Sequence, residues 1–239
     1  MKYILRMILV VVSAIVGATL AVARPGDTPG GYAPVAAPAT ELDSVGRDTG
    51  YVSTILVRAA KVTDALGISG TERGTQVMNI VANRYFELND IYAERDSMKS
   101  IAREQGGEEG RRLMAAAEDA KDRRLYRSHF AFDADLSLYL TPEEIITVKD
   151  VMTYNVVKVT YEAHCDMIPT LTDEEKAQIM AWLVEAREFA IDAESSKKKH
   201  EVFGNYKGRI NNYLTKRGYD LQKERAAWEE RVKARGGRL

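Results

Sequence analysis

The sequence has few of the side chains that cross-link a fold. It contains one cysteine and three histidines among 239 residues. One cysteine cannot form a disulfide within the chain, and these residues are too few for a zinc site of four thiolates or of paired thiolates and imidazoles. Both classes of cross-linked fold are therefore excluded, and neither a metal nor another cofactor is expected.

The sequence also lacks a strong excess of either charge. It has 34 Lys and Arg residues against 35 Asp and Glu residues, a formal net charge of -1. Proteins that bind nucleic acids through the phosphate backbone usually carry a marked positive charge. A nucleic-acid partner is therefore not expected, while 45% hydrophobic and 29% charged residues are typical of a globular protein.

The motifs of common enzyme classes are missing. There is no Gly-x-Ser-x-Gly nucleophile motif, and the segment 204–209 (GNYKGR) lacks the spacing of a phosphate-binding loop. Cys165 follows His164 directly, and adjacent side chains diverge, so the pair does not indicate a cysteine–histidine catalyst. His129 and Asp133 stand four residues apart, a spacing that is common in helical ion pairs. No reaction is indicated, and we expect a binding protein rather than an enzyme.

Residues 1–23 have the order of a secretory signal peptide. Lys2 and Arg6 precede an uncharged apolar run, and Ala21-Val22-Ala23 supplies small residues at the cleavage site. The run has about 16 residues, fewer than the ~20 that a bilayer span requires, and a permanent N-terminal anchor is the alternative. We therefore expect cleavage after Ala23, a mature protein in the periplasm or outside the cell, and no membrane span after cleavage.

The rest of the chain divides into a linker and one helical domain. Residues 24–48 are rich in Pro and Gly without a hydrophobic period, which predicts a flexible linker. From Tyr51 onward, hydrophobic residues recur every three or four positions, a pattern typical of amphipathic helices. We expect a single helical domain over 49–239, with a first helix that ends at Gly67.

Capping boxes indicate three further helix starts. In such a box, a Ser or Thr and a Glu three positions later accept hydrogen bonds from each other's free backbone N–H. The first would begin a long helix over 72–104, and the Gly106-Gly107 pair would turn the chain into a returning helix over 108–139. The three boxes are Ser69–Glu72, Thr141–Glu144 with Pro142 at the first helical position, and Thr172–Glu175.

One segment favours strand over helix. Residues 153–161 (TYNVVKVTY) are rich in β-branched side chains, but a lone strand has no partner, so we predict a short irregular segment there. Two last helices are expected from about Asn205 to Lys216 and from Asp220 to about Lys233. The predicted architecture is all-α, a single bundle of about six helices around the long hairpin.

Positive charge is concentrated near the C-terminus. Residues 195–239 contain 13 Lys and Arg against 5 Asp and Glu, a balance of +8. A concentrated positive region on an otherwise acidic protein suits an anionic partner, although a solvated basic helix has the same composition.

The segment 197–220 combines these cations with aromatic and amide side chains. Aromatic rings suit the apolar face of a sugar, amides and guanidinium groups suit hydroxyls, and cations suit the carboxylates of acidic sugars. The alternative is structural, with the tyrosines packed in the core. The candidate ligand-binding residues are Tyr206, Lys207, Arg209, Asn211 and Asn212, with Arg95 and Asp96 from the 72–104 helix.

Several segments together resemble a known family. They are LNDIYAERD (88–96), TLTDEEKAQI (170–179), AREFAIDA (186–193), SSKKKH (195–200), and YKGRINNYL with GYDL (206–221). The chain from Tyr51 to Trp228 resembles the exported family called domain of unknown function 3826. The resemblance implies a sugar-binding role beside polysaccharide-degrading systems, and it implies no reaction and no catalytic residue.

These observations lead to one expectation and two alternatives. We expect an exported carbohydrate-binding accessory protein for polysaccharide utilisation, with acidic glycans as the ligand. The motifs LTPEE and LTDEE resemble, without their Gln, the repeats of periplasmic helical chaperones, so a chaperone or stress protein is one alternative. An unrecognised glycan-active enzyme is the other. An apolar strip along a thin hairpin would favour the chaperone, and two facing carboxylates in a polar pocket would favour the enzyme.

Overall fold

The computed structural model describes residues 37–236, and every regular element in this range is an α-helix. The predicted signal peptide, 1–23, and residues 24–36 of the predicted linker lie outside the described residues. The prediction of an all-α fold is confirmed. None of the helices in the described range combines the length and the hydrophobicity of a membrane span.

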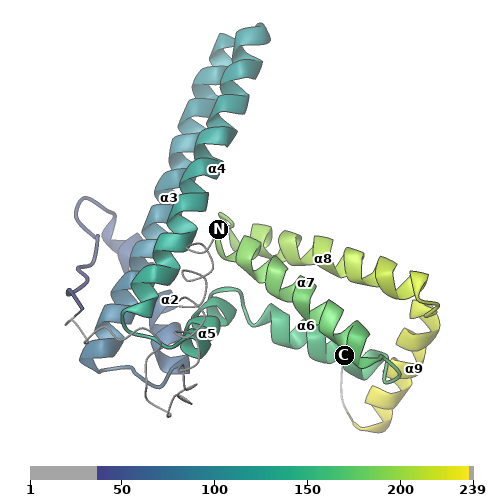
Figure 1. Ribbon diagram of the computed structural model, residues 1–239. Coiled ribbons are helices and arrows are strands. Elements are labelled where there is room, and N and C mark those ends of the chain that lie inside the picture. Colours follow the sequence, from purple (N-terminus) through teal and green to yellow (C-terminus); the bar gives the residue numbers. More distant parts are fainter. Residues whose placement is uncertain (1–36, 237–239) are drawn as a thin grey trace, which may run out of the picture. The chain divides into compact units, whose positions relative to one another are not determined.

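The described residues form eight helices, against about six expected, and Figure 1 labels them in chain order. All of them belong to one unit, residues 38–239. The helices are α2 (Thr49–Ala65), α3 (Glu72–Gln105), α4 (Gly107–Ser137), α5 (Pro142–Met152), α6 (Val156–Met167), α7 (Asp173–Ile191), α8 (Ser196–Lys216) and α9 (Leu221–Ala234).

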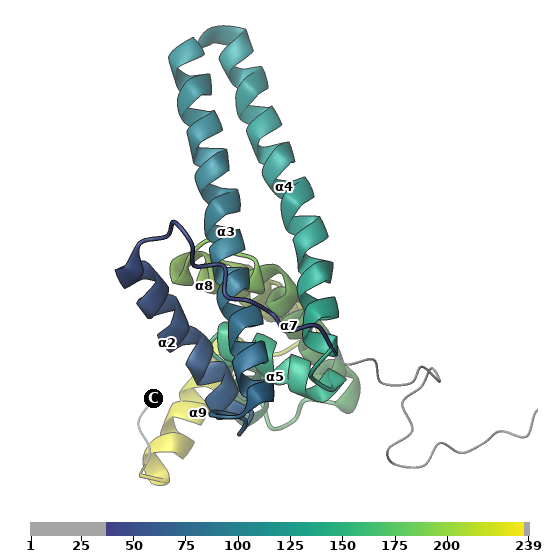
Figure 2. The ribbon, with the colours of Figure 1, turned by 90° about the vertical axis from the view of Figure 1, so that its left-hand side faces the viewer.

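The predicted long hairpin is confirmed as α3 and α4, which lie side by side in both ribbon views (Figures 1 and 2). The chain reverses at Gly106 and Gly107, both of which have positive φ (63° and 59°). Residues with a Cβ atom are strained in this region of backbone space, so the glycine pair explains why the hairpin turns where it does.

Two of the predicted capping boxes are confirmed. The side chains of Thr141 and Thr172 accept hydrogen bonds from the backbone N–H groups of Glu144 and Glu175, and each glutamate accepts one in return. These boxes fix the starts of α5 and α7, because they satisfy backbone donors that the first helical turn leaves free.

The third predicted box is wrong, since Ser69 does not cap α3. The cap is Thr71, whose hydroxyl oxygen accepts a hydrogen bond from Gly74 N at 2.9 Å. The Ser69 hydroxyl instead donates to the carboxylate of Asp64, at the end of α2, at 2.5 Å. The helix still starts at Glu72, as predicted, but its N-cap is Thr71 and not Ser69.

The predicted irregular segment at 153–161 is also wrong for most of its length, because α6 begins at Val156. Tyr154 and Asn155 have positive φ (62° and 55°) and make the turn between α5 and α6. For a bulky residue this backbone conformation costs about 1–3 kcal/mol. Beyond the turn, Val156 and Thr160 are buried on one face of the helix, and this packing overrides the strand propensity of β-branched side chains.

The core consists of two hydrophobic clusters. The first surrounds Phe86 and is built by α2, α3, α4 and α5. The second includes Ile210 and is built by α6, α7 and α8. Ile191, at the C-terminal end of α7, packs in the first cluster, so α7 contributes to both. The segment 197–220 folds against the rest of the bundle, because Ile210 and Leu214 are fully buried.

The described part of the predicted linker runs along α3 (Figure 2). Asp43 N donates to Asn83 Oδ1 at 2.8 Å, and Asn83 Nδ2 donates to the carbonyl of Glu41 at 2.8 Å. The Arg47 guanidinium donates to both carboxylate oxygens of Asp90, at 2.9 and 2.8 Å. Residues 40–47 are therefore hydrogen-bonded to α3 ahead of α2.

Burial of the second cluster predicts which truncations destabilise the protein. Leu214→Ala should lower the free energy of unfolding by about 2–5 kcal/mol, because it leaves a cavity between α7 and α8. The control Val159→Ala, at a side chain that is 62% exposed, should change it by less than about 0.5 kcal/mol. Urea unfolding of both variants checks this, and equal stabilities would contradict the packing of α8.

Candidate functional site

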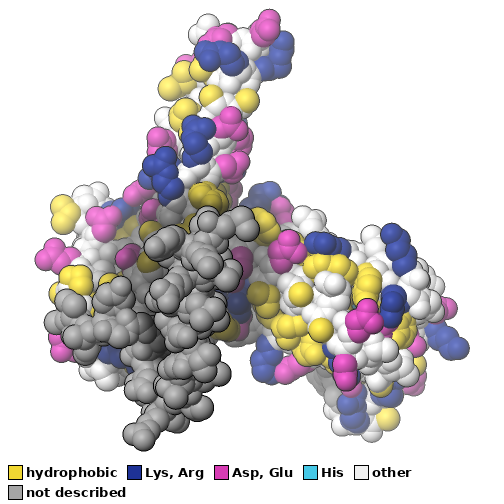
Figure 3. Space-filling model, viewed as in Figure 1, with side chains coloured by type: hydrophobic (Ala, Val, Ile, Leu, Met, Phe, Trp, Pro, Cys, Tyr) yellow, Lys and Arg dark blue, Asp and Glu magenta, His cyan; other side chains and the backbone are white. Residues whose placement is uncertain are grey.

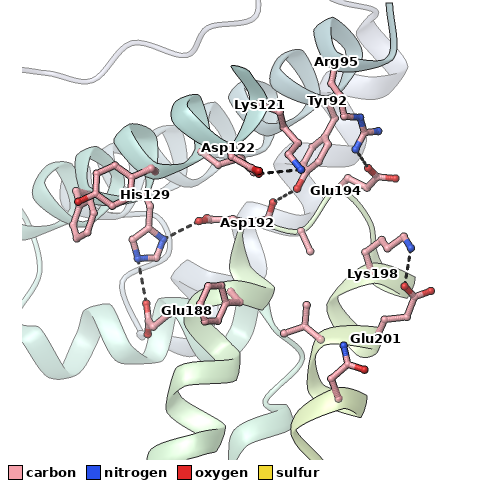
Figure 4. A pocket seen from close by; sticks show the side chains of 17 residues that line it. Tyr92, Arg95, Lys121, Asp122, His129, Glu188, Asp192, Glu194, Lys198 and Glu201 are labelled. Atoms are coloured by element: carbon pink, nitrogen blue, oxygen red, sulfur yellow. Dashed lines mark hydrogen bonds and ion pairs between the residues drawn. The ribbon is translucent and has the colours of Figure 1, made fainter. Parts of the chain in front are cut away.

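A cleft of about 720 Å³ lies between α3, α4, α7 and α8. We call it the His129 cleft, after the residue at its floor (Figure 4). The connection 192–195 between α7 and α8 forms part of its wall. Concave sites of this size are typical of small-molecule and oligomer binding.

Three aromatic side chains at the cleft are turned toward solvent. Tyr126 and Phe130 lie one turn apart on α4, with their ring centroids 5.1 Å apart in an edge-on arrangement. Phe189 lies on α7. Their exposed fractions are 70%, 57% and 62%. Because a folded chain gains nothing by leaving large rings in water, a group of them around one cavity indicates a binding surface.

The floor of the cleft is centred on Asp192. Its Oδ2 lies 2.9 Å from His129 Nδ1, and its Oδ1 accepts a hydrogen bond from the Arg84 guanidinium at 2.6 Å. Its backbone carbonyl accepts a hydrogen bond from the Tyr92 hydroxyl at 2.8 Å. Residues from α3 and α4 thus hold the C-terminal end of α7 in place.

A second carboxylate, Glu188, continues this contact toward α5. It lies one turn before Asp192 on α7, 3.6 Å from His129 Nε2 and 2.6 Å from Lys149 Nζ. Lys149 is buried, and its charge is also neutralised by Asp133, at 2.7 Å. We call this connected set the buried ion network. Its members are Arg84, His129, Asp133, Lys149, Asp150, Arg187, Glu188 and Asp192.

The network favours the charged form of His129. The hydrogen bond to Asp192 raises the pKa of the imidazole above its usual value, and this effect outweighs burial, which lowers it. Each ring nitrogen faces a carboxylate, so the imidazolium joins Asp192 to Glu188. No group of His, Cys, Asp and Glu side chains among residues 37–236 is arranged to hold a metal ion, and His129 and Asp133 serve the ion network.

The rim of the cleft carries ion pairs that are partly exposed (Figure 4). The pair of Lys198 with Glu201, in which both side chains are exposed, contributes only about 0–1 kcal/mol to stability. A ligand with hydroxyl groups can therefore exchange hydrogen bonds with this pair at small cost. The pairs are Arg95 with Glu194 at 2.6 Å, Lys121 with Asp122 at 3.0 Å, and Lys198 with Glu201 at 2.7 Å.

The structure divides the predicted binding residues among separate places. Arg95 lines the His129 cleft, and Asp96 is bound to the guanidinium of Arg95. Arg209 and Asn212 line a different, shallow hollow on α8. Tyr206 is half-buried, while Lys207 and Asn211 are exposed, and none of the three lines that hollow.

The α8 hollow also contains a residue that sequence reasoning missed. Trp182, on α7, lies beneath the Arg209 guanidinium, which is 4.6 Å from the ring centroid. Arg209 is further held by Glu185, at 3.3 Å. Arg209, one of the predicted binding residues, therefore already has two partners within the protein.

Sequence reasoning also missed the aromatic side of the His129 cleft. The hydrophobic stripe of the 108–139 helix runs through Leu113, Ala117 and Leu125, and Tyr126 and Phe130 fall outside it. Large aromatic residues off the stripe were the available signal, since a solvated helix face seldom carries them. The contact between His129 and Asp192 spans 63 residues and left no such signal.

The raised pKa of His129 predicts a pH-dependent contribution to stability. Protonated His129 should stabilise the fold fully below about pH 6.5, the unfolded pKa, and the contribution should be lost as pH rises through the higher folded pKa. The destabilisation caused by His129→Gln should therefore be larger at about pH 5.5 than at about pH 9. Urea unfolding measures it, with His200→Gln, at an exposed position, as the control. A pH-independent difference would contradict the ion network.

Comparison with known proteins agrees with the sequence segments noted above. The family model described as "Protein of unknown function (DUF3826)" matches residues 52–234. No curated protein matches the chain. The matched range covers α3 to α9 and every residue that lines the His129 cleft. The chain therefore belongs to the DUF3826 family of proteins of unknown function.

Proposed function

We propose that this protein binds a carbohydrate in the His129 cleft, as an exported accessory protein of polysaccharide utilisation. The observation that supports this most is the group of exposed aromatic side chains on α4 and α7 around a cavity with a charged rim. Sugars combine apolar ring faces with many hydroxyl groups, and the cleft offers a complement to both.

The aromatic side of the cleft accounts for contact with sugar rings. Tyr126, Phe130 and Phe189 come from facing helices, α4 and α7, so a ring between them can be contacted from two sides. Burial of their exposed area on binding supplies a favourable hydrophobic contribution of about 25 cal/mol per Å².

The polar rim accounts for contact with hydroxyl groups. Arg95, Lys121 and Lys198 provide N–H donors, and Glu194 and Glu201 provide acceptors. Charge-assisted hydrogen bonds are stronger than neutral ones, so they can orient a ligand that stacking alone would leave free to rotate.

The arrangement favours binding over cleavage. A glycosidase requires one carboxyl group free to donate a proton to the leaving group. In the cleft, Asp192 is bound by Arg84 and His129, and Glu188 by Lys149. The carboxylates of the rim are paired as well, Glu194 with Arg95, Asp122 with Lys121 and Glu201 with Lys198. Because each carboxylate that lines the cleft has a cationic partner, binding is favoured over proton donation to a leaving group.

The hairpin gives less support to the chaperone alternative. Figure 3 shows acidic, basic and hydrophobic side chains interspersed on α3 and α4 beyond the rest of the protein. In this outer part, Ile101 is the one large hydrophobic side chain among the described residues that is strongly exposed. A client-binding strip would require a continuous row of them.

Removal of the aromatic faces should weaken glycan binding. Phe189→Ala and Tyr126→Ala should each lower the affinity about five- to tenfold, corresponding to about 1–1.4 kcal/mol of lost stacking. Both side chains are largely exposed, so unfolding midpoints should not change. The control is Val57→Ala on α2, which removes an exposed side chain outside the cleft.

A glycan array of the mature protein should identify the ligand, and isothermal titration with that ligand should compare the variants. If the Tyr126→Ala, Phe189→Ala double variant binds the glycan with the same affinity as the wild type, the cleft is not the binding site. Binding of unfolded polypeptides in place of glycans would favour the chaperone.

The α8 hollow supports a separate, sequence-based prediction for acidic glycans. Arg209→Ala should lower affinity for an acidic glycan about tenfold or more, because a charge-assisted hydrogen bond is lost, and high salt should weaken what remains. Arg209→Lys should restore little, since lysine cannot bind both carboxylate oxygens. Equal affinity of the wild type and Arg209→Ala would assign this arginine to its contacts with Trp182 and Glu185 alone.

A further inference from the structure

A second, smaller cavity lies on the other side of the α7–α8 connection. Its volume is about 170 Å³, and α2, α3, α8 and the turn before α6 contribute its walls. We call it the Lys199 pocket. Four tyrosines line it, together with two cations: Tyr51, Tyr85, Tyr92, Tyr154, Arg58 and Lys199. Tyr92 and residues 193–194 line the His129 cleft as well, so the two cavities are neighbours.

Lys199 is a buried cation without an acidic partner. Its residue is 5% exposed, and its Nζ donates one hydrogen bond, to the carbonyl of Met152 at 3.1 Å. Lys149, which is 6% exposed, shows what such a residue normally requires, because two carboxylates bind it. Within residues 37–236, no carboxylate lies within 4.0 Å of Lys199 Nζ. An ammonium group has three N–H donors, so two of them have no hydrogen-bond partner among the described residues, and the Tyr85 ring, 5.6 Å from Nζ, faces the charge in place of a carboxylate.

The charged groups around Lys199 do not supply the missing anion. Arg58 on α2 lines the same pocket, and within the described residues it forms no ion pair. Arg84 on α3 adds positive charge nearby, and Asp192 at the end of α7, which opposes it, is bound by Arg84 and His129. Glu194, at the wall, is bound by Arg95.

Burial dominates the protonation of Lys199. Burial is the largest of the effects that together lower the pKa of the amine to about 8; Asp192 opposes it, and Arg58 and Arg84 add to it. The neighbouring Tyr85 hydroxyl has its pKa raised to about 12, also by burial, so it stays protonated. The pocket is thus a desolvated, electropositive site, in which the attraction between a bound anion and the cations would be strong.

The rim of the pocket contains the strained turn. Tyr154, with its positive φ, lies over the imidazole of His200, with ring centroids 5.3 Å apart and planes 16° apart. Strain of this kind is retained at sites where the position of a side chain matters. Here the strained turn keeps the half-exposed ring of Tyr154 at the rim of the Lys199 pocket.

We propose that the Lys199 pocket binds the carboxylate of an acidic sugar, with Lys199 and Arg58 as its counter-ions and the tyrosines as its walls. The proposal rests on the proposed function for the choice of a sugar, and it adds a defined site, with named counter-ions, for the acidic group that the sequence leads us to expect. The volume of the pocket is small compared with the ~300–1,000 Å³ of sites that enclose whole ligands, so the pocket suits a single sugar residue. Because it adjoins the His129 cleft, the following residues of a glycan would lie along the aromatic side chains.

The affinity of the Lys199 pocket for an acidic sugar should depend on pH in a defined direction. A bound carboxylate stabilises the ammonium form of Lys199, so binding above about pH 8 has to take up a proton. Affinity for an acidic sugar should therefore fall as pH rises from about 7 to about 9.5, whereas affinity for a neutral sugar should not.

Glucuronate and glucose form a matched pair of ligands, since they differ only in a carboxylate against a hydroxymethyl group. Isothermal titration of the mature protein should show tighter binding of glucuronate at pH ~7, and Lys199→Met should weaken it about ten- to a hundredfold. Lys199→Met replaces a buried, unpaired charge by an apolar side chain, so it should fold at least as well as the wild type. Arg58→Gln, at an exposed residue, is the second variant, and Lys197→Met, an exposed lysine of the same turn, is the control.

A trimer of glucuronate distinguishes a glycan from a free sugar acid as the ligand. Trimer binding that is tighter than monomer binding, and that loses the difference in Phe189→Ala, would support a glycan reaching from the pocket into the cleft. Equal, Lys199-dependent binding of monomer and trimer would support a free sugar acid in the pocket.

Glucuronate affinity that does not change in Lys199→Met, or with pH, would overturn the proposal, while cleft-dependent binding of a neutral glycan would leave the proposed function standing. Absence of any glycan binding by the wild type would overturn both.

Discussion

The buried ion network around Asp192 and Glu188 is the constraint on which the rest of the structure depends. It connects Arg84 of α3 and His129 of α4, which belong to helices of the first hydrophobic cluster, to α7, the main helix of the second. Removal of one partner from a buried ion pair typically costs about 3–5 kcal/mol, because the other charge stays buried without compensation. The alignment of α7 with the hairpin is therefore fixed by charges whose partners are few and specific.

This constraint shapes the His129 cleft. Because Asp192 and Glu188 are held by cations from three other helices, the floor is rigid, and the adaptable groups are the rim ion pairs and the exposed rings. A preorganised cavity loses little conformational entropy when a ligand binds. The geometry thus favours recognition of a ligand of defined shape, as the proposed carbohydrate would be.

Two buried lysines illustrate how the same residue type serves different ends. Lys149 is neutralised by Asp133 and Glu188 and so contributes to the fold. Lys199, equally buried, has one backbone carbonyl as its hydrogen-bond partner and the ring of Tyr85 facing its charge, with no carboxylate among the described residues within 4.0 Å. The difference lies wholly in the neighbours, since burial alone disfavours both charges.

The sequence by itself determined the helical character, the hairpin turn at Gly106-Gly107 and the starts of α5 and α7, because periodicity, glycine geometry and capping act within a few residues of the chain. It also carried the segments that place the chain in its family. Only the tertiary structure decided that 156–167 is a helix, because burial against α7 overrides local propensity. It likewise separated Arg95 from Arg209 and brought His129 to Asp192, since contacts between residues far apart in the chain depend on how helices pack and leave no local pattern.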